Sequence, residues 1–404
     1  MVRCAMWAGV VALAVAGNCQ AQNTFEITVS AGKVDRVNTP VTVPLTVPAD
    51  QAKTGLATLE AEGKTLIGQV TAPGLLSKQE GKLARELHFI LPELKAGASK
   101  TYKVTLGGSA SGDKFTWKDT PGKSSELSFG DHPVLRYMYE ALDPKNREET
   151  YKVYHHLFDP AGKRVVTKGP GGQYTHHRGL YLGFNKITYA DGKKKCDVWH
   201  CSGKAYQSHE KVLASEAGPV LGRHTLEIGW HGQEGEIFAV EERELTVYHV
   251  PGGQLVEFAA RVRSADGKPI KLDGDPQHAG FQFRADQEVA AKTKGQTYYI
   301  RPDGKDKPGA TKQGGDFPWK GMSFVLGEQR YTAGYLDRPG NPKPAQYSER
   351  DYGRFGSYFV YEVTKDKPLE IDYQLWLQEG EMDIPQLAAR AASFAEPVQV
   401  SVKP

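Results

Sequence analysis

The sequence lacks any long apolar run beyond its first residues. After Ala21, no segment approaches the roughly 18 consecutive apolar residues that a membrane-spanning helix requires. It also lacks a strong charge imbalance, because 51 basic and 48 acidic residues give a formal net charge of +3. Such a balance gives no reason to expect a nucleic-acid partner. With 39% hydrophobic and 25% charged residues, the composition is that of an ordinary globular protein.

The first residues, "MVRCAMWAGVVALAVAGNCQAQ", have the pattern of a secretory signal peptide. Arg3 supplies positive charge, residues 5–16 form a short apolar core, and small residues surround Ala21. We expect cleavage after Ala21 and a periplasmic or secreted location. Asn18 disfavours a lipid anchor at Cys19, because lipidation signals usually have a small residue before the cysteine.

Cysteine is scarce in the mature chain. Of the four cysteines, Cys4 and Cys19 lie in the signal segment, which leaves Cys196 and Cys201 in "CDVWHC". Because an exported protein meets an oxidising compartment, we expect these two to form a disulfide that closes a tight loop. The alternative is zinc held by both thiolates and His200. A structural zinc site needs four ligands, however, and the chain has no second cysteine pair.

Helical patterns are also scarce, and alternating runs dominate. Residues 23–107 contain short runs such as "TFEITVS" and "TYKVTL" between turn-forming residues, which indicate a β-sandwich. From Leu127 onward, longer runs such as "GLYLGFNKI" and "LEIDYQLWL" indicate a larger set of strands, split into two packed sheets. The one convincing helix is "DIPQLAARAASF", which Asp383 can cap.

We therefore predict an all-β protein, in which an N-terminal immunoglobulin-like β-sandwich precedes a large β domain with one C-terminal helix. The stretch "GGSASGDKFTWKDTPGKSS" is rich in glycine, serine and lysine and indicates a linker. The predicted segments are a signal peptide (1–21), a β-sandwich domain (22–110), a linker (111–126) and the domain that carries the site (127–404).

The stretch "GGQYTHHRGLYLGF" places nitrogen-rich side chains directly before a strand. His176, His177 and Arg178 come first, and apolar residues then alternate along the strand. If the strand includes the histidines, alternation assigns His177 to the face of Tyr181, opposite the packed face. We therefore expect His177 to be the acid, base or ligand and His176 to support it. A bulge near Gly179 would exchange the two roles, and an exposed loop is the alternative.

Other polar clusters lie at further strand ends. In "CDVWHC", a carboxylate, an indole and an imidazole suit a sugar, because indoles stack on pyranose rings and carboxylates bind hydroxyls. In "EERELTV", Glu241 and Arg243 face an apolar surface and need partners, which a cleft lined by this pair would provide. Each cluster has a structural alternative, such as a packed tryptophan or a solvated strand end. The candidate substrate-binding residues are Arg178, Asp197, Trp199, His278, Arg284, Tyr347, Arg350 and Tyr352.

Several motifs in order resemble a bacterial secreted family of unknown function whose members often carry a methane oxygenase PmoA-like label. The motifs are "THHRGLYLGF", "CDVW", "EER", "HAGFQFR", "SERDYGRFG" and "LWLQEGEM". The resemblance covers roughly residues 127–397. It implies a mutarotase-like β-supersandwich and an occurrence in bacteria that degrade complex glycans. The residues that it favours as functional are His176, His177, Arg178, Asp197, Trp199, Arg284, Arg350 and Tyr352.

The chain departs from the family pattern at two places. The family usually has an Asp-His pair just before the two histidines, where this chain has Gln173 and Tyr174. It often has an aromatic-His pair before the Arg-Asp-Tyr-Gly run, where this chain has Tyr347 and Ser348. Two imidazoles are therefore missing, which weakens a mechanism that needs a large histidine cluster.

Three functions stay open at this point. The first is an exported carbohydrate-active enzyme of epimerase, lyase or hydrolase type, in which His176 or His177 moves protons with Glu241 as partner. The second is a glycan-binding protein without catalysis. The third is an enzyme with a divalent metal, zinc or iron, held by His176, His177 or His278 and a carboxylate. A methane oxygenase is not among them, because a particulate methane oxygenase crosses the membrane with many helices.

Overall fold

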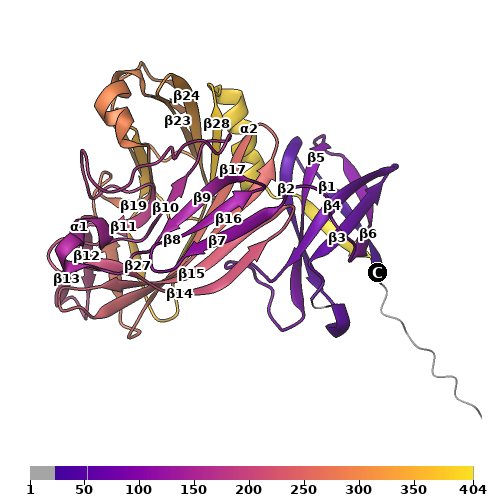
Figure 1. Cartoon of the computed structure of the whole chain (residues 1–404), viewed down its shortest axis with the longest axis horizontal. Coiled ribbons are helices and arrows are strands. Elements are labelled where there is room, and N and C mark those ends of the chain that lie inside the picture. Colours follow the sequence, from indigo (N-terminus) through magenta and orange to yellow (C-terminus); the bar gives the residue numbers. More distant parts are fainter. Residues whose placement is uncertain (1–22, 52, 404) are drawn as a thin grey trace, which may run out of the picture.

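A computed structural model describes residues 23–51 and 53–403, and within them β-strands dominate (Figure 1). The predicted signal peptide lies outside the described residues. Across the described ranges, the strands form four sheets. None of the helices in this part of the chain has the length and apolar character to cross a membrane.

The N-terminal sheet has the strand order β2-β5-β4-β3-β6-β1-β29. Its inward side chains, among them Ile27, Val43 and Phe89, pack into an apolar core of their own. This is the predicted N-terminal sandwich. Its strands are β1 (Thr24–Ser30), β2 (Arg36–Thr46), β3 (Leu56–Ala61), β4 (Lys64–Thr71), β5 (Ala84–Leu94), β6 (Ser99–Leu106) and β29 (Gln399–Lys403).

The edge strand β29 comes from the C-terminus, so the chain returns to its first sheet (Figure 1). Val400 pairs with Val29 in antiparallel register. Residues 115–120, inside the predicted linker, also form a strand, β7, which belongs to the large body. Strand pairing therefore crosses the expected boundaries twice, and the division into separately folding domains stays a prediction.

The first large sheet of the body carries the site. Its strand order is β22-β25-β26-β19-β11-β10-β9-β8-β7. Its strands are β7 (Phe115–Thr120), β8 (Ser124–Phe129), β9 (His132–Met138), β10 (Tyr154–Leu157), β11 (Leu180–Phe184), β19 (Ala279–Arg284), β22 (Lys312–Gln313), β25 (Gln346–Arg350) and β26 (Arg354–Tyr358).

The second large sheet packs against the first. Its order is β14-β15-β16-β17-β28-β24-β23-β20-β21. The rings of Phe258 and Phe281, one from each sheet, stack with centroids 4.0 Å apart. Its strands are β14 (Tyr206–Ala217), β15 (Leu221–His231), β16 (Ile237–Val250), β17 (Gly253–Ser264), β20 (Tyr298–Arg301), β21 (Gly304–Lys305), β23 (Trp319–Leu326), β24 (Gln329–Asp337) and β28 (Leu369–Glu379).

A small third sheet and short helices complete the body. The small sheet has the order β13-β12-β18-β27, from β12 (Lys186–Tyr189), β13 (Lys194–Cys196), β18 (Ile270–Asp273) and β27 (Tyr361–Val363). The helical segments are η1 (Ala49–Gln51), η2 (Pro144–Asn146), α1 (Arg147–Thr150), η3 (Val289–Thr293), η4 (Lys294–Gln296) and α2 (Ile384–Ala395).

The predicted all-β supersandwich with one C-terminal helix is confirmed. Helix α2 begins as the sequence indicates, because the Asp383 side chain accepts a hydrogen bond from the Gln386 N–H while the Gln386 side chain accepts one from the Asp383 N–H. Strand β11 also alternates as expected. Leu182 faces the central core, whereas Tyr181 lies on the opposite face with Trp199. This second face of the sheet carries the polar residues described next.

Candidate functional site

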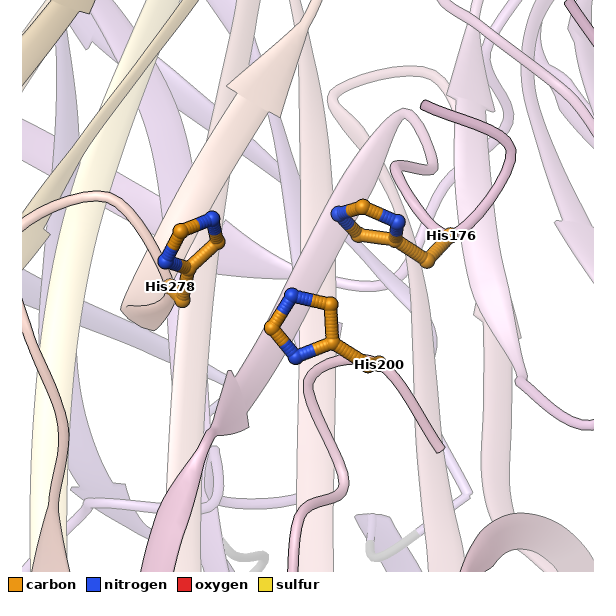
Figure 2. A group of neighbouring side chains, drawn as sticks. All are labelled: His176, His200 and His278. Carbon is orange, nitrogen blue, oxygen red and sulfur yellow. The ribbon is translucent and has the colours of Figure 1, made fainter. Parts of the chain in front are cut away.

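Three imidazoles from distant parts of the chain meet beside the first large sheet (Figure 2). His176 lies in the turn before β11, His200 in the loop after β13, and His278 in the turn before β19. One potential ligand atom from each side chain lies within 4.8 Å of the others. The ring centroid of His200 lies 4.5 Å from that of His176 and 4.8 Å from that of His278. Small side-chain rotations would bring three nitrogens to one ion, since zinc binds histidine at about 2.0–2.1 Å.

Carboxylates orient two of these three rings. His200 Nδ1 lies 2.7 Å from Asp197 Oδ2, and His278 Nδ1 lies 3.0 Å from Asp275 Oδ1. The second carboxylate is itself held by Asn185, which donates a hydrogen bond of 3.0 Å to Asp275 Oδ2. Both rings therefore keep Nε2 free, which is the arrangement that prepares histidine for metal ligation.

The electrostatics of the triad favour the neutral, ligating form of histidine. Burial and the nearby Lys152 ammonium lower the pKa of His176 well below its ordinary value. Burial also lowers the pKa of His278, although Asp275 partly offsets that effect. Neutral imidazoles bind a metal without first losing a proton. The side chains of His200 and His278 are each 30% exposed, so the triad remains accessible from solvent.

A shallow cavity of about 370 Å³ opens beside two members of the triad, His176 and His200. It is lined by Arg147, Glu148, Tyr151, Thr175, His176, His200 and Cys201. A cavity of about 540 Å³ also exists, between the N-terminal sheet and α2, but none of the three histidines lines it. The smaller opening is therefore the one that adjoins the candidate site.

His176 and His177 lie in a turn and not in the strand, so the expected strand alternation was the wrong basis for ranking them. His176 faces the triad. His177 is only 2% exposed, and neither ring nitrogen has a hydrogen-bond partner among the described residues. Its ring packs near those of Trp199 and Tyr352, each with a centroid distance of 6.1 Å. The role of His177 as acid or base stays a prediction.

Glu241 does not partner a histidine, which corrects the expected acid–base pair. Its two carboxylate oxygens accept hydrogen bonds from Arg243 Nε at 2.6 Å and from Trp230 Nε1 at 2.9 Å. All three side chains are buried in the interior. The sequence correctly indicated that Glu241 and Arg243 need partners, but they find them in each other and not in a cleft.

The predicted disulfide is absent, since Cys196 and Cys201 are free, buried thiols. The two sulfur atoms face different partners. Cys196 Sγ lies 3.7 Å from the His231 carbonyl, and Cys201 Sγ lies 3.3 Å from the Val198 carbonyl. Burial raises the pKa of Cys196 to about 12 and that of Cys201 to about 11. Both groups are thus inert thiols and not metal-binding thiolates.

The remaining predicted residues divide between the site and its supports. Trp199 and Tyr352 lie beside His177, Arg284 lies over the Tyr352 ring, and Arg350 is paired in the strand register with Arg354. Arg178 supports the histidine turn, because it donates hydrogen bonds to the carbonyls of His177 and Glu148. Tyr347 lies in the interior, where its hydroxyl donates to Asp337 at 3.3 Å, and takes no part in the triad.

Two functional candidates escaped the sequence analysis. His200 was considered as a sugar-binding imidazole and as a zinc ligand beside the two thiolates, but not as a partner of His176 and His278, although the spacing of Asp197 and His200 already permits the hydrogen bond that the structure contains. Arg354 carried no separate signal in "SERDYGRFG", because its importance depends on the strand register that places it opposite Arg284.

The chain is similar to one family of proteins and, more distantly, to several solved structures. A family model described as "Family of unknown function (DUF6807)" matches residues 124–392. No curated protein matches the sequence. Among solved structures, a protein in the glycosyl hydrolase family 38 from Enterococcus faecalis is similar with a TM-score of 0.45 and 8% identity, over 95% of this chain and 48% of that one.

Two further solved structures are similar to this chain. An α-mannosidase from Enterococcus faecalis V583 has a TM-score of 0.45 and 9% identity, over 95% of this chain and 46% of that one. The GH36 α-galactosidase AgaB from Geobacillus stearothermophilus has a TM-score of 0.35 and 10% identity, over 68% of this chain and 42% of that one. This chain therefore spans less than half the length of each.

Proposed function

The chain belongs to DUF6807, a family of unknown function, and we propose that it is an exported, metal-dependent enzyme that acts on carbohydrate at the triad of His176, His200 and His278. The observation that carries this proposal is the convergence of three imidazoles, two of them oriented by carboxylates. Loop histidines that meet by chance have no reason to carry matched Asp-x-x-His hydrogen bonds on both sides.

A set of three neutral nitrogen ligands suits a divalent ion of the zinc or iron type. With only three protein ligands, such an ion keeps an open position for water or substrate. When bound, the ion would activate that water or polarise a substrate oxygen. The protein's own contribution is to fix the rings through Asp197 and Asp275, and to hold His177 close by as a neutral imidazole.

The carbohydrate substrate is supported by the rim of the site. Tyr174 is 46% exposed and has a φ of 54°, an uncommon conformation for a residue with a side chain. Its ring lies 6.2 Å from His176 and 5.0 Å from Tyr352. A partly exposed ring held in this way beside a polar centre suits the apolar face of a sugar. The signal-like first residues support the exported location.

Metal analysis of the purified full chain tests the proposal. The protein is loaded separately with Zn²⁺, Fe²⁺ and Mn²⁺, dialysed, and measured by elemental mass spectrometry. We expect about one tightly held ion per chain in the wild type and in H249A, whose histidine is exposed. H200A should lose it. Turnover on a panel of glycans and keto-sugars should then be sensitive to chelators. No bound ion, or full retention by H200A, would overturn the proposal.

A further inference from the structure

Three arginines lie side by side across three neighbouring strands of the sheet that carries the triad. Arg284 on β19 is directly opposite Arg354 on β26, and Arg354 is directly opposite Arg350 on β25. Directly opposite residues of antiparallel strands have their side chains on the same face, with Cβ atoms about 4.5–5.5 Å apart. Like charges in such positions destabilise a sheet, so this row needs a reason.

Two of the three arginines are buried without a carboxylate partner among the described residues. Arg284 and Arg354 are both 0% exposed, and among the described residues neither forms an ion pair. Arg284 donates through Nη1 to the carbonyls of Ala285 and Tyr352, which leaves its Nε and Nη2 without a partner. Buried donors of this kind are costly to leave unpaired.

Arg354 has the same deficit. It donates to Gln282 Oε1 at 3.3 Å and to Ser348 Oγ at 3.0 Å, and its Nη2 has no partner in the described ranges. Burial lowers the pKa of both Arg354 and Arg284 to about 10, and a neighbouring guanidinium adds to the effect in each case, Arg350 for Arg354 and Arg354 for Arg284. Among the described residues, Asp275 and Asp286 offset this only at a distance, and neither forms an ion pair with the two guanidinium groups.

Buried lysines beside the row increase the excess of positive charge. Lys168 donates only to backbone carbonyls, including that of Gly171 at 2.5 Å, and Lys152 donates to the carbonyl of His176 at 2.6 Å. Burial lowers the pKa of Lys168 to about 7, so an anion bound beside it would favour its charged form. A buried cation without a partner is unfavourable, and the two unpaired guanidinium groups therefore indicate that an anion joins them.

The row borders the histidine triad. The Arg354 guanidinium lies 5.1 Å from the centroid of Trp199, and that ring lies 6.4 Å from His278. On the other side, the Arg284 guanidinium lies 4.9 Å from the ring of Tyr352, which is 6.1 Å from His177. One aromatic ring therefore separates the arginines from the imidazoles on each side.

We infer that the arginine row binds an oxyanionic group of the substrate, a carboxylate, sulfate or phosphate, beside the histidine triad. Guanidinium groups present paired donors that match the oxygens of such groups. The substrate class is then a charged sugar, such as a uronic acid or a sugar sulfate or phosphate. This inference rests on the proposed function, because it names the substrate of the same site.

Thermal unfolding of the metal-free full chain tests this inference. Sodium acetate, sulfate and phosphate are each compared with sodium chloride at equal ionic strength. We expect at least one oxyanion to raise the unfolding midpoint of the wild type by about 2 °C or more beyond its effect on R354M and R284M. The effective anion identifies the group: acetate indicates a carboxylate, and sulfate or phosphate indicates the corresponding ester.

Two further variants make the result interpretable. R261M removes an arginine that pairs with Glu242 and Glu370 on the other large sheet, so it should keep the wild-type shift. R350A removes the partly exposed end of the row and serves as the test if R354M and R284M do not fold. Equal shifts in the wild type and in the row variants would overturn the inference, as would no shift with any oxyanion.

The unfolding experiment and the metal analysis together separate the two proposals. An arginine-dependent oxyanion shift in a protein that binds no metal would keep this inference and refute the metal site. Metal binding without that shift would do the reverse.

Discussion

Two buried arginine sites in this protein differ in one respect, which is whether a carboxylate lies beside them. On β16, Arg243 is 0% exposed and forms an ion pair with Glu241, while Trp230 completes the carboxylate's hydrogen bonds. On β19 and β26, Arg284 and Arg354 are equally buried but face each other with no carboxylate partner among the described residues. At the first site the charge of the arginine is neutralised by a buried carboxylate. At the second site the unpaired guanidinium groups suggest that a ligand supplies the missing negative charge.

The largest expected effect comes from breaking the paired site. R243M leaves the Glu241 carboxylate buried without its cation, so we expect the free energy of unfolding to fall by about 3–5 kcal/mol. Urea unfolding followed by fluorescence measures this loss. E242Q is the control. Glu242 is the neighbouring residue of Glu241, and its partners Arg261 and Arg263 are partly exposed, so this substitution should lower the free energy of unfolding by less than about 1 kcal/mol. A small loss in R243M would mean that pairing does not distinguish the two sites.

Removing the metal from the histidine triad should have the next largest effect. A ligand that binds only the folded state stabilises it by about 2.7 kcal/mol at a concentration 100 times its dissociation constant. We therefore expect a chelator to lower the unfolding midpoint of the metal-loaded wild type, and to have no effect on H278A. E241Q should keep the chelator response of the wild type at a lower midpoint. Loss of the response in E241Q would place Glu241 in the site after all.

The same substitution that breaks the paired site should be tolerated at the unpaired one. R354M removes a buried charge that has no carboxylate, so its free energy of unfolding should change by less than about 1 kcal/mol or rise. Urea unfolding of R354M and R243M under identical conditions gives the comparison directly. A loss in R354M as large as that in R243M would indicate that Arg354 is structural.

A partly buried carboxylate offers a complementary test. Glu257 accepts hydrogen bonds from Gln374 and Tyr248, and desolvation together with the nearby Asp372 raises its pKa to about 7, although Arg338 partly offsets the effect. Its folded-state pKa lies above the ordinary value of 4.5, so the folded state binds more protons between these values. Stability should therefore fall as the pH rises from about 4.5 to 7.

E257Q removes this titration. We expect E257Q to be more stable than the wild type by about 1–2 kcal/mol at pH 8 and to lose that advantage at pH 5. Urea unfolding at the two pH values measures the difference. A difference of the same size at both pH values would show that the carboxylate of Glu257 is already ionised at pH 5.

Much of the fold was predictable because its signals are local. Alternation identified the strands, and the Asp383 cap and its helix are short-range features of the chain. The packed face of β11 was also correct, because Leu182 lies in the core and Tyr181 opposite it. The disulfide was wrong because two cysteines close in sequence still turned their sulfur atoms to different carbonyls.

The site was only partly predictable because it is assembled over long range. His176 and His278 were both candidates, but their meeting with His200 depends on how three loops fold beside one sheet. Arg354 became a candidate only because the strand register places it opposite Arg284, and a single sequence does not reveal that register. Glu241 looked functional because an unpaired and a paired buried charge have the same appearance in a sequence.

The central claim is that three histidines hold one metal ion, and anomalous diffraction from a crystal of the zinc-loaded protein tests it most directly. We expect one anomalous peak that is strong in data collected above the zinc absorption edge and weak in data collected below it. The peak should lie about 2.0–2.1 Å from a nitrogen of each of His176, His200 and His278. Zinc bound elsewhere, with these three rings still apart and free of metal, would contradict it.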